Sequence, residues 1–212
     1  LYPGRRIVEA GTGSAGLTMA LAWSVAPAGM VYTYENREDA YRGARANLER
    51  VGLLPHVTMH LRGIDDGFVE EGVDALFLDV REPWEFIAQV RKALRPGGIF
   101  AALMPTTNQV SSLLEVMEAQ GFADIAVEEI LLRPYKPVPD RLRPMDTMTA
   151  HTGYLAFGRM LADVSEAGRW LSKSRQRFLA RREMEAEYAA TAEARELARN
   201  PEGKKYPPMP LP

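Results

Sequence analysis

Ile7-Val-Glu-Ala-Gly-Thr-Gly-Ser-Ala-Gly-Leu-Thr18 is the stretch that decides the fold of this chain of 212 residues. An apolar run stops at a glycine-rich turn and continues with a helical pattern, which predicts a strand, a turn and a helix. Gly11, Gly13 and Gly16 allow the backbone to approach a ligand closely, and the helix behind them presents unpaired N–H groups. The stretch therefore predicts a nucleotide-type cofactor site, and a strand, turn and helix without a ligand is the alternative.

Two acidic residues bear on which cofactor this turn would hold. Gly-x-Gly-x-x-Gly suits a dinucleotide or S-adenosylmethionine (SAM), and Glu35, about twenty positions further on, suits the ribose hydroxyls of either ligand. Glu9 precedes the first glycine by two residues, so we expect its carboxylate at the mouth of the turn. There it would oppose a pyrophosphate and favour a cationic sulfonium. The pattern therefore favours SAM over a nicotinamide dinucleotide.

The composition is that of an ordinary globular protein, with 46% hydrophobic and 25% charged residues and a net charge of −2. Without cysteines a disulfide framework is excluded, and His56, His60 and His151 lack the spacing of metal ligands, so we expect no metal site. No apolar run approaches the roughly 20 residues of a membrane span, and no signal peptide opens the chain. We therefore expect a cytoplasmic protein that contacts no membrane. Because Leu1 is not an initiator methionine, we also expect a segment upstream of it.

Strand-like apolar runs alternate with helical patterns through most of the chain. The expected strands are residues 5–10, 30–35, 56–61, 73–79, 98–104, 125–133 and 152–159, and the expected helices are residues 14–25, 38–51, 83–94 and 107–120. This order predicts an α/β fold that is doubly wound around a mostly parallel sheet, with ligands beyond the carboxyl ends of the strands. Glu9, Glu35 and Asp79 all fall at such ends.

Residues 1–161 are expected to form the main domain, residues 162–200 a helical extension, and residues 201–212 a proline-rich tail. The extension carries a basic run without an acid from Ala167 to Arg182. This run could bind phosphate, but we favour a solvated helical face or a helix docked on a neighbouring subunit, because the acids Glu183, Glu185 and Glu187 follow at once. The prolines of the tail favour extended chain unless a partner holds them.

Asp79-Val-Arg-Glu-Pro-Trp84 follows a nearly continuous apolar strand and predicts a base-binding pocket. The carboxylate of Asp79 can accept a hydrogen bond from an exocyclic amine, and Trp84 can provide an apolar wall. The alternatives are a helix cap at Asp79 and core packing of Trp84. Two further segments accompany this pocket. Residues 94–98 predict a tight turn, and residues 105–109 place polar groups at the same edge of the sheet.

With these motifs in place, the chain resembles the tRNA adenine-N1 methyltransferases, which modify an adenosine of the T-loop. The resemblance extends from about residue 2 to residue 161. It rests on Glu9-Ala-Gly-Thr-Gly-Ser-Ala-Gly-Leu-Thr18, Tyr34-Glu-Asn-Arg37, Leu78-Asp79 with Pro83-Trp84, Pro105 with Gln109-Val110, and Arg143-Pro144 with His151-Thr-Gly-Tyr-Leu155. The last groups are more specific to the family than the glycine turn is.

The resemblance implies a seven-stranded Rossmann-like methyltransferase sheet, SAM as cofactor, tRNA as substrate and a homotetramer. It also implies that Asp79 is catalytic, binds the amino group of the target adenine and lies near the methyl group. From the residue pattern and the resemblance together, the residues expected to hold the cofactor are Glu9, Gly11, Thr12, Gly13, Ser14, Gly16, Leu17, Glu35, Asn36, Gly63, Ile64, Asp65 and Asp79. Trp84, Arg133, Tyr135, Lys136 and Arg143 are expected to contact the RNA, since residues 133–143 form a second basic stretch.

The sequence departs from the family at three places. Gly63 stands near a position that is often acidic and contacts the cofactor adenine, so that role could pass to Asp65, Asp66 or a main-chain group. Thr106 replaces a common asparagine, and the small N-terminal β domain of the family is not found here. Three other functions therefore stay open: a methyltransferase for another acceptor, a non-catalytic RNA-binding subunit and a nicotinamide dehydrogenase. His151 is expected to be structural rather than catalytic.

Overall fold

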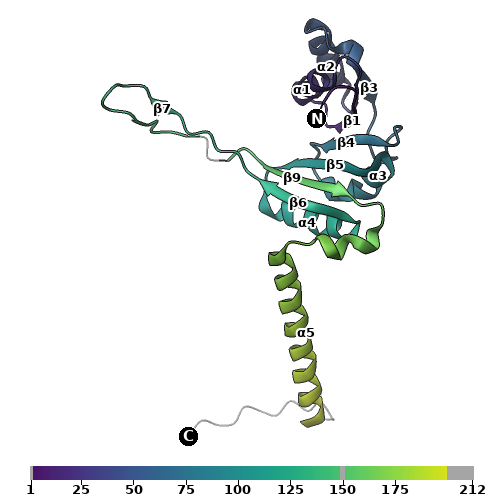
Figure 1. Ribbon diagram of the computed structural model, residues 1–212, viewed down its shortest axis with the longest axis vertical. Coiled ribbons are helices and arrows are strands. Elements are labelled where there is room, and N and C mark those ends of the chain that lie inside the picture. The colour runs from purple at the N-terminus through teal and green to yellow at the C-terminus, as the bar shows by residue number, and fades with distance from the viewer. Residues whose placement is uncertain (1, 149–150, 200–212) are drawn as a thin grey trace. The chain divides into compact units, whose positions relative to one another are not determined.

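The computed structural model describes residues 2–148 and 151–199, with side chains as far as residue 191 (Figure 1). The chain divides into two units, Leu1–Trp170 and Leu171–Pro212. The first unit contains the sheet and the helices that cover it. In the second unit the described element is a helix, α5 (Lys173–Arg199), which falls within the predicted helical extension of residues 162–200. The proline-rich tail lies outside the described residues.

A seven-stranded sheet in the order β3-β2-β1-β4-β5-β9-β6 forms the centre of the first unit. Its strands are β1 (Arg6–Ala10), β2 (Met30–Glu35), β3 (Val57–Leu61), β4 (Val73–Leu78), β5 (Leu94–Met104), β6 (Phe122–Glu128) and β9 (Tyr154–Met160). The strands β1 to β5 pair in parallel, whereas β9 runs antiparallel to both β5 and β6. The predicted α/β fold with a doubly wound, mostly parallel sheet is thereby confirmed.

Helices cover both faces of this sheet. They are α1 (Gly16–Val25), α2 (Glu38–Arg50), α3 (Ile87–Ala93) and α4 (Thr107–Ala119), with short 3-10 helices at Leu54–His56, Pro83–Phe86 and Val164–Trp170. Successive strand residues point to opposite faces. Ile7 therefore packs with Val25 and Leu48 of α1 and α2, whereas the next residue, Val8, belongs to the core that contains Leu113 of α4. The alternation of β1 thus separates two apolar cores.

The structure corrects three expected boundaries. The first helix begins at Gly16 and not at residue 14, because Ala15 adopts a left-handed conformation with φ of 67° that a helix cannot include. Residues 94–98 do not form a separate turn but lie within β5. Leu94 pairs with Val73 and Ile99 with Ala75, so β5 contains more residues than β4 over this stretch and the pairing is irregular there, as in a β-bulge. The predicted strand at residues 125–133 is instead β6, which begins at Phe122 and ends at Glu128.

The chain beyond β6 leaves the sheet as a long hairpin, visible in Figure 1 as the arm between β6 and β9. Two short antiparallel strands, β7 (Tyr135–Lys136) and β8 (Arg143–Pro144), pair within it. The hairpin accounts for the wrong end of the predicted strand. The apolar run at residues 130–132 continues the apolar pattern of β6, but it lies in the hairpin, where its side chains are 53–79% exposed. Periodicity alone cannot show whether a neighbouring strand is present.

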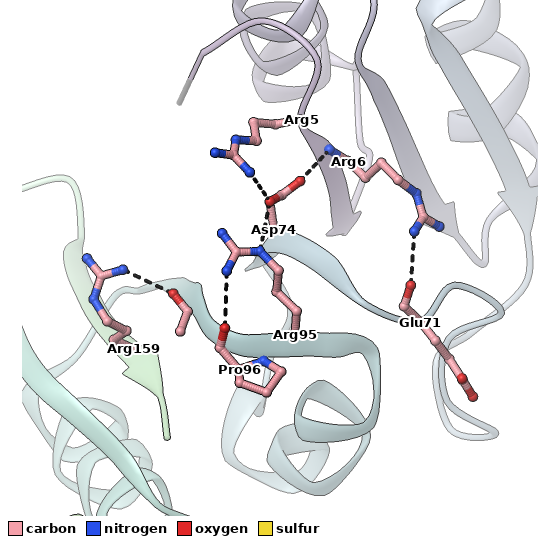
Figure 2. A network of polar contacts seen from close by, with 8 residues as sticks. Arg5, Arg6, Glu71, Asp74, Arg95, Pro96 and Arg159 are labelled. Atoms are coloured by element: carbon pink, nitrogen blue, oxygen red, sulfur yellow. Dashed lines mark hydrogen bonds and ion pairs between the residues drawn. The ribbon is translucent and has the colours of Figure 1, made fainter. Parts of the chain in front are cut away.

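At the amino-terminal ends of the parallel strands, Asp74 joins three segments (Figure 2). Its carboxylate accepts hydrogen bonds from Arg5 Nη1 at 2.6 Å, from the Arg6 N–H at 3.0 Å and from Arg95 Nε at 2.9 Å. Partial burial opposes its charge, but the N–H of Arg6 and the two guanidinium groups outweigh this and lower the pKa of Asp74. This network stabilises the sheet at the edge opposite the carboxyl ends of its strands.

Candidate active site

A pocket of about 580 Å³ opens at the carboxyl ends of the parallel strands, where the fold predicts a ligand. Its volume is within the roughly 300–1,000 Å³ of ordinary ligand pockets. The residues that line it are Ala10, Gly11, Gly13, Tyr34, Glu35, Asn36, Arg37, Arg62, Gly63, Ile64, Asp65, Asp79, Val80, Arg81, Glu82, Glu85 and Phe86. The segments that follow β1, β2, β3 and β4 therefore meet in one cavity.

Gly11 lies where two of these segments are in direct contact. Its N–H donates to the Tyr34 carbonyl at 3.0 Å, and the Asp79 N–H donates to the Ala10 carbonyl at 2.9 Å. A Cβ atom at position 11 would lie 2.1 Å from the Asp79 carbonyl oxygen, and φ is 93°. Both the space and the backbone conformation therefore require glycine. The close approach brings the glycine turn and Asp79 to the same side of the pocket.

The carboxylate of Glu35 holds the glycine turn in place. It is 6% exposed, and its Oε2 accepts a hydrogen bond from the Gly13 N–H at 2.9 Å. Oε1 accepts from the Arg37 N–H at 3.0 Å and lies 3.4 Å from Arg37 Nε. Each carboxylate oxygen can accept more than one hydrogen bond, so Glu35 can still bind a hydroxyl in the pocket.

Glu9 does not lie where the sequence pattern placed it. Its side chain is buried behind the turn, only 1% exposed, and its Oε2 accepts hydrogen bonds from Thr18 Oγ1 at 2.5 Å and from Thr33 Oγ1 at 2.8 Å. Burial, with the nearby charge of Asp79, outweighs these two hydrogen bonds and raises the pKa of Glu9 to about 7. The expectation of a carboxylate at the mouth is therefore wrong, because β1 directs this side chain towards α1 and β2.

The charged residues of the pocket wall, and not Glu9, favour a cationic ligand. Five acids line the pocket, namely Glu35, Asp65, Asp79, Glu82 and Glu85, against the three bases Arg37, Arg62 and Arg81, which leaves two formal negative charges. A cationic ligand is therefore favoured over a pyrophosphate. The preference comes from several strand ends together and not from one residue.

Asp79 directly follows β4 and exposes its carboxylate to the pocket. Partial desolvation raises the pKa of Asp79 above its ordinary value, so this carboxylate is a stronger acceptor than a fully solvated one. Trp84, in contrast, is half-buried against the core and does not line the pocket; the aromatic side chain in the wall is Phe86. The 3-10 turn at Pro83–Phe86 has this effect, because it directs Trp84 inwards.

Tyr34 also lines the pocket, although no catalytic or binding motif of the sequence pointed to it. It is buried, its hydroxyl donates to Glu70 Oε2 at 2.5 Å, and the Val69 N–H donates to the hydroxyl at 2.8 Å. His60 stacks on its ring with centroids 4.5 Å apart and contacts the other oxygen of Glu70 at 2.9 Å. The only possible signal was the family segment at residues 34–37. This network fixes the loop that follows β3 against the end of β2.

A second chain of hydrogen bonds connects the base of the hairpin with the rim of the pocket. His151 Nε2 lies 2.8 Å from the Pro105 carbonyl oxygen, and its Nδ1 lies 2.5 Å from Glu129 Oε1. Glu129 and the Pro105 carbonyl raise the pKa of His151, because both ring nitrogens face acceptors. Four residues after Pro105, Gln109 Nε2 donates to the Arg81 carbonyl at 3.0 Å. The segment that follows Asp79 is thereby tied to the hairpin.

The remaining expected site residues lie outside the pocket wall. Thr12 is buried, and its hydroxyl is hydrogen-bonded to that of Thr33 at 2.6 Å; Ser14, Gly16 and Leu17 are exposed in the turn and at the start of α1. Arg133, Tyr135, Lys136 and Arg143 all lie on the hairpin, where Lys136 forms an ion pair with Asp146. Eight of the expected cofactor residues do line the pocket: Gly11, Gly13, Glu35, Asn36, Gly63, Ile64, Asp65 and Asp79.

Residues 2–148 and 151–199 contain no group of three or more His, Asp or Glu side chains arranged to hold a metal ion. In these same ranges, no helix combines the length and the apolar character that crossing a membrane requires.

Residues 1–141 match the sequence profile of a family described as the tRNA methyltransferase complex GCD14 subunit. The chain belongs to this family. Among curated relatives, this GCD14-family chain is 32% identical over 184 residues to the tRNA (adenine(57)-N(1)/adenine(58)-N(1))-methyltransferase TrmI of Methanocaldococcus jannaschii, covering 74% of the chain and 65% of that protein. It is 33% identical to the tRNA (adenine(58)-N(1))-methyltransferase TrmI of Thermus thermophilus, covering 73% of the chain and 61% of the relative. The chain thus spans less than two thirds of the length of these relatives.

Solved structures of the same fold include two with substantial sequence identity to this GCD14-family chain. The tRNA (m1A58) methyltransferase TrmI from Aquifex aeolicus has a TM-score of 0.71 and 41% identity, over 77% of this chain and 65% of its own. A SAM-dependent O-methyltransferase from Thermotoga maritima has a TM-score of 0.75 and 46% identity, and the match covers 76% of this chain and 61% of that structure's chain. The two are described with different acceptor atoms.

Proposed function

We propose that this chain is a SAM-dependent methyltransferase that transfers a methyl group to N1 of an adenosine in the tRNA T-loop. The observation that carries the proposal is the position of Asp79, whose carboxylate faces the pocket beside the glycine turn of a chain in this tRNA methyltransferase family. The fold, the volume of the pocket and its negative charge all suit SAM, which is a cation at its sulfonium.

When bound, SAM would be held by the glycine turn and Glu35 and would supply an electrophilic methyl group for transfer to adenine N1, with S-adenosylhomocysteine as the leaving group. The residues of the chain act by position and charge. Asp79 accepts a hydrogen bond from the 6-amino group of the target adenine and holds N1 in line. The adenine ring becomes cationic during transfer, so a carboxylate already directed at it stabilises the transition state without reorganisation. The raised pKa of Asp79 strengthens this acceptor.

The base must leave the tRNA elbow to reach this pocket, so we infer that the enzyme opens the RNA locally. The hairpin is the element we assign to RNA contact, since Arg133, Tyr135 and Arg143 are exposed on it. It also exposes Ile130, Leu132 and Leu142 by 70–79%. Apolar side chains of this number on one arm favour burial against another subunit. We therefore propose a homo-oligomer, with the tetramer expected from the family, acting in the cytoplasm.

The decisive experiment supplies the purified protein with SAM and an unmodified tRNA transcript and identifies the methylated nucleoside by mass spectrometry. We expect 1-methyladenosine in the T-loop, and we expect Asp79→Asn to lower turnover by about a hundredfold or more while SAM affinity changes little. Glu82→Gln, a change in another acid of the pocket wall, is the matched control and should retain most of the turnover. Equal losses of turnover and of SAM affinity in Asp79→Asn would contradict the assigned role.

A methyltransferase for an oxygen acceptor is the second candidate, because the Thermotoga structure with 46% identity is described as an O-methyltransferase. The same assay separates the two: a 2′-O-methylated nucleoside, or transfer to a small hydroxylated acceptor without transfer to tRNA, would favour the second function. Binding of SAM without transfer to either acceptor would indicate a non-catalytic subunit. Tighter binding of NAD than of SAM would indicate a dehydrogenase.

A further inference from the structure

The charge of the pocket wall suits a cationic cofactor but opposes an RNA substrate. Five acids and three bases line the pocket. An extruded base brings the phosphates that adjoin its nucleotide to the rim of the pocket. The excess of acids repels these phosphates. A basic side chain at the rim that is not already engaged within the protein would offset this repulsion.

Two of the three bases in the wall are engaged. Arg37 Nε lies 3.4 Å from Glu35 Oε1. Arg62 donates from Nε to the Gly63 carbonyl at 3.2 Å and from Nη2 to the Gly67 carbonyl at 2.8 Å. Both guanidinium groups therefore already hold segments of the pocket wall in place.

The third base, Arg81, has a fixed backbone and a free side chain. Gln109 Nε2 donates to the Arg81 carbonyl at 3.0 Å, and Gln109 Oε1 in turn accepts from Thr106 Oγ1 at 2.8 Å. The side chain of Arg81 is exposed and lines the pocket. In the chain as far as the structure describes it, the Arg81 guanidinium forms no hydrogen bond or ion pair. An anchored backbone with an unengaged donor is preorganised to bind a ligand.

Arg81 also lies close to the carboxylate assigned to the target base. Val80 packs against the core, whereas Asp79 and Arg81, on either side of it, are exposed. Two residues of chain span at most about 7 Å. If Asp79 holds the adenine, the long side chain of Arg81 is within reach of the backbone of the same nucleotide. Its planar guanidinium can donate two parallel hydrogen bonds to a phosphate.

We propose that Arg81 binds a phosphate that adjoins the extruded adenosine and thereby holds the nucleotide whose base Asp79 orients. This inference rests on the proposed transfer of a methyl group to tRNA. A carboxylate is the other anion that a guanidinium binds in this way, and SAM carries one. The test therefore measures the affinity for the cofactor product as well as the affinity for RNA.

The first measurement is the affinity for an unmodified tRNA transcript at a series of salt concentrations, with S-adenosylhomocysteine present. R81Q should bind the transcript about tenfold more weakly at low salt, and the slope of log Kd against log salt concentration should fall by about 1. R81K should keep most of the slope, because lysine retains the charge. R45Q is the control, since Arg45 is an exposed arginine of α2 that does not line the pocket.

The second measurement identifies the phosphate. Two transcripts are prepared, each with a neutral methylphosphonate in place of one of the two phosphates next to the target adenosine. Wild-type protein should bind one of these transcripts about tenfold more weakly than the unmodified one, whereas R81Q should show no further loss with it. Independent losses from R81Q and from both methylphosphonates would overturn the contact.

The remaining outcomes separate this inference from the proposed function. If the wild-type protein neither binds nor methylates the transcript, the proposed function fails and the role of Arg81 fails with it. If the wild type methylates the T-loop adenosine but R81Q keeps the wild-type affinity and salt slope, only the role of Arg81 is overturned. Weaker binding of S-adenosylhomocysteine by R81Q, measured by titration calorimetry, would assign Arg81 to the cofactor carboxylate instead. An equal change of slope in R45Q would also overturn the inference.

Discussion

The buried carboxyl group of Glu9 makes folding stability depend on pH in a way that one substitution can isolate. Its pKa rises from the ordinary 4.5 to about 7 in the folded protein, mainly because burial disfavours the charged form. A difference of one pKa unit between the folded and the unfolded state changes the free energy of unfolding by about 1.4 kcal/mol. Between pH 4.5 and pH 7, Glu9 is therefore mostly protonated in the folded state and mostly ionised in the unfolded state. The free energy of unfolding consequently falls by about 3 kcal/mol as the pH rises through this range.

Glu9→Gln removes this dependence, because the neutral amide replaces the protonated acid and its oxygen can still accept from Thr18 and Thr33. Near pH 5 the variant and the wild type should have similar free energies of unfolding. Near pH 8 the variant should be the more stable by up to about 3 kcal/mol. Urea denaturation across this range, with the exposed Glu49→Gln as the control for a lost surface charge, measures the difference. Parallel pH profiles for wild type and Glu9→Gln would refute the reasoning.

Three further results are expected. Gly11→Ala should lower the free energy of unfolding by about 3 kcal/mol or more, because its Cβ would meet a carbonyl oxygen at 2.1 Å and φ is 93°. The control Gly43→Ala, which has open space around it in α2, should instead raise the free energy of unfolding by up to about 1 kcal/mol. Asp74→Asn should lower the unfolding free energy by about 2 kcal/mol at neutral pH, a difference that must shrink below about pH 4 as wild-type Asp74 itself becomes protonated. An NMR titration should find the pKa of His151 above 6.5, and Glu129→Gln should lower it; an unchanged value would contradict the contact.

Local patterns were sufficient to predict most of the first unit. The change from strand to helix at the glycine turn and the repeated alternation gave the order of strands and helices. Because parallel strands all end at the same edge, Glu35 and Asp79 could be assigned to one pocket before any contact was known. The irregular hairpin escaped prediction, since residues 130–132 are as apolar as a buried strand but are exposed.

The sequence by itself determined the fold class, the glycine turn and the strand ends that carry acids, since these depend on periodicity and on short-range backbone preferences. Only the tertiary structure decided which way individual side chains point. In the structure Glu9 points into the interior, Phe86 and not Trp84 lines the pocket, and the carboxylate of Asp65 lies beside Gly63. The physical reason is that the direction of a side chain depends on the elements packed around it, and those elements lie far away in the sequence.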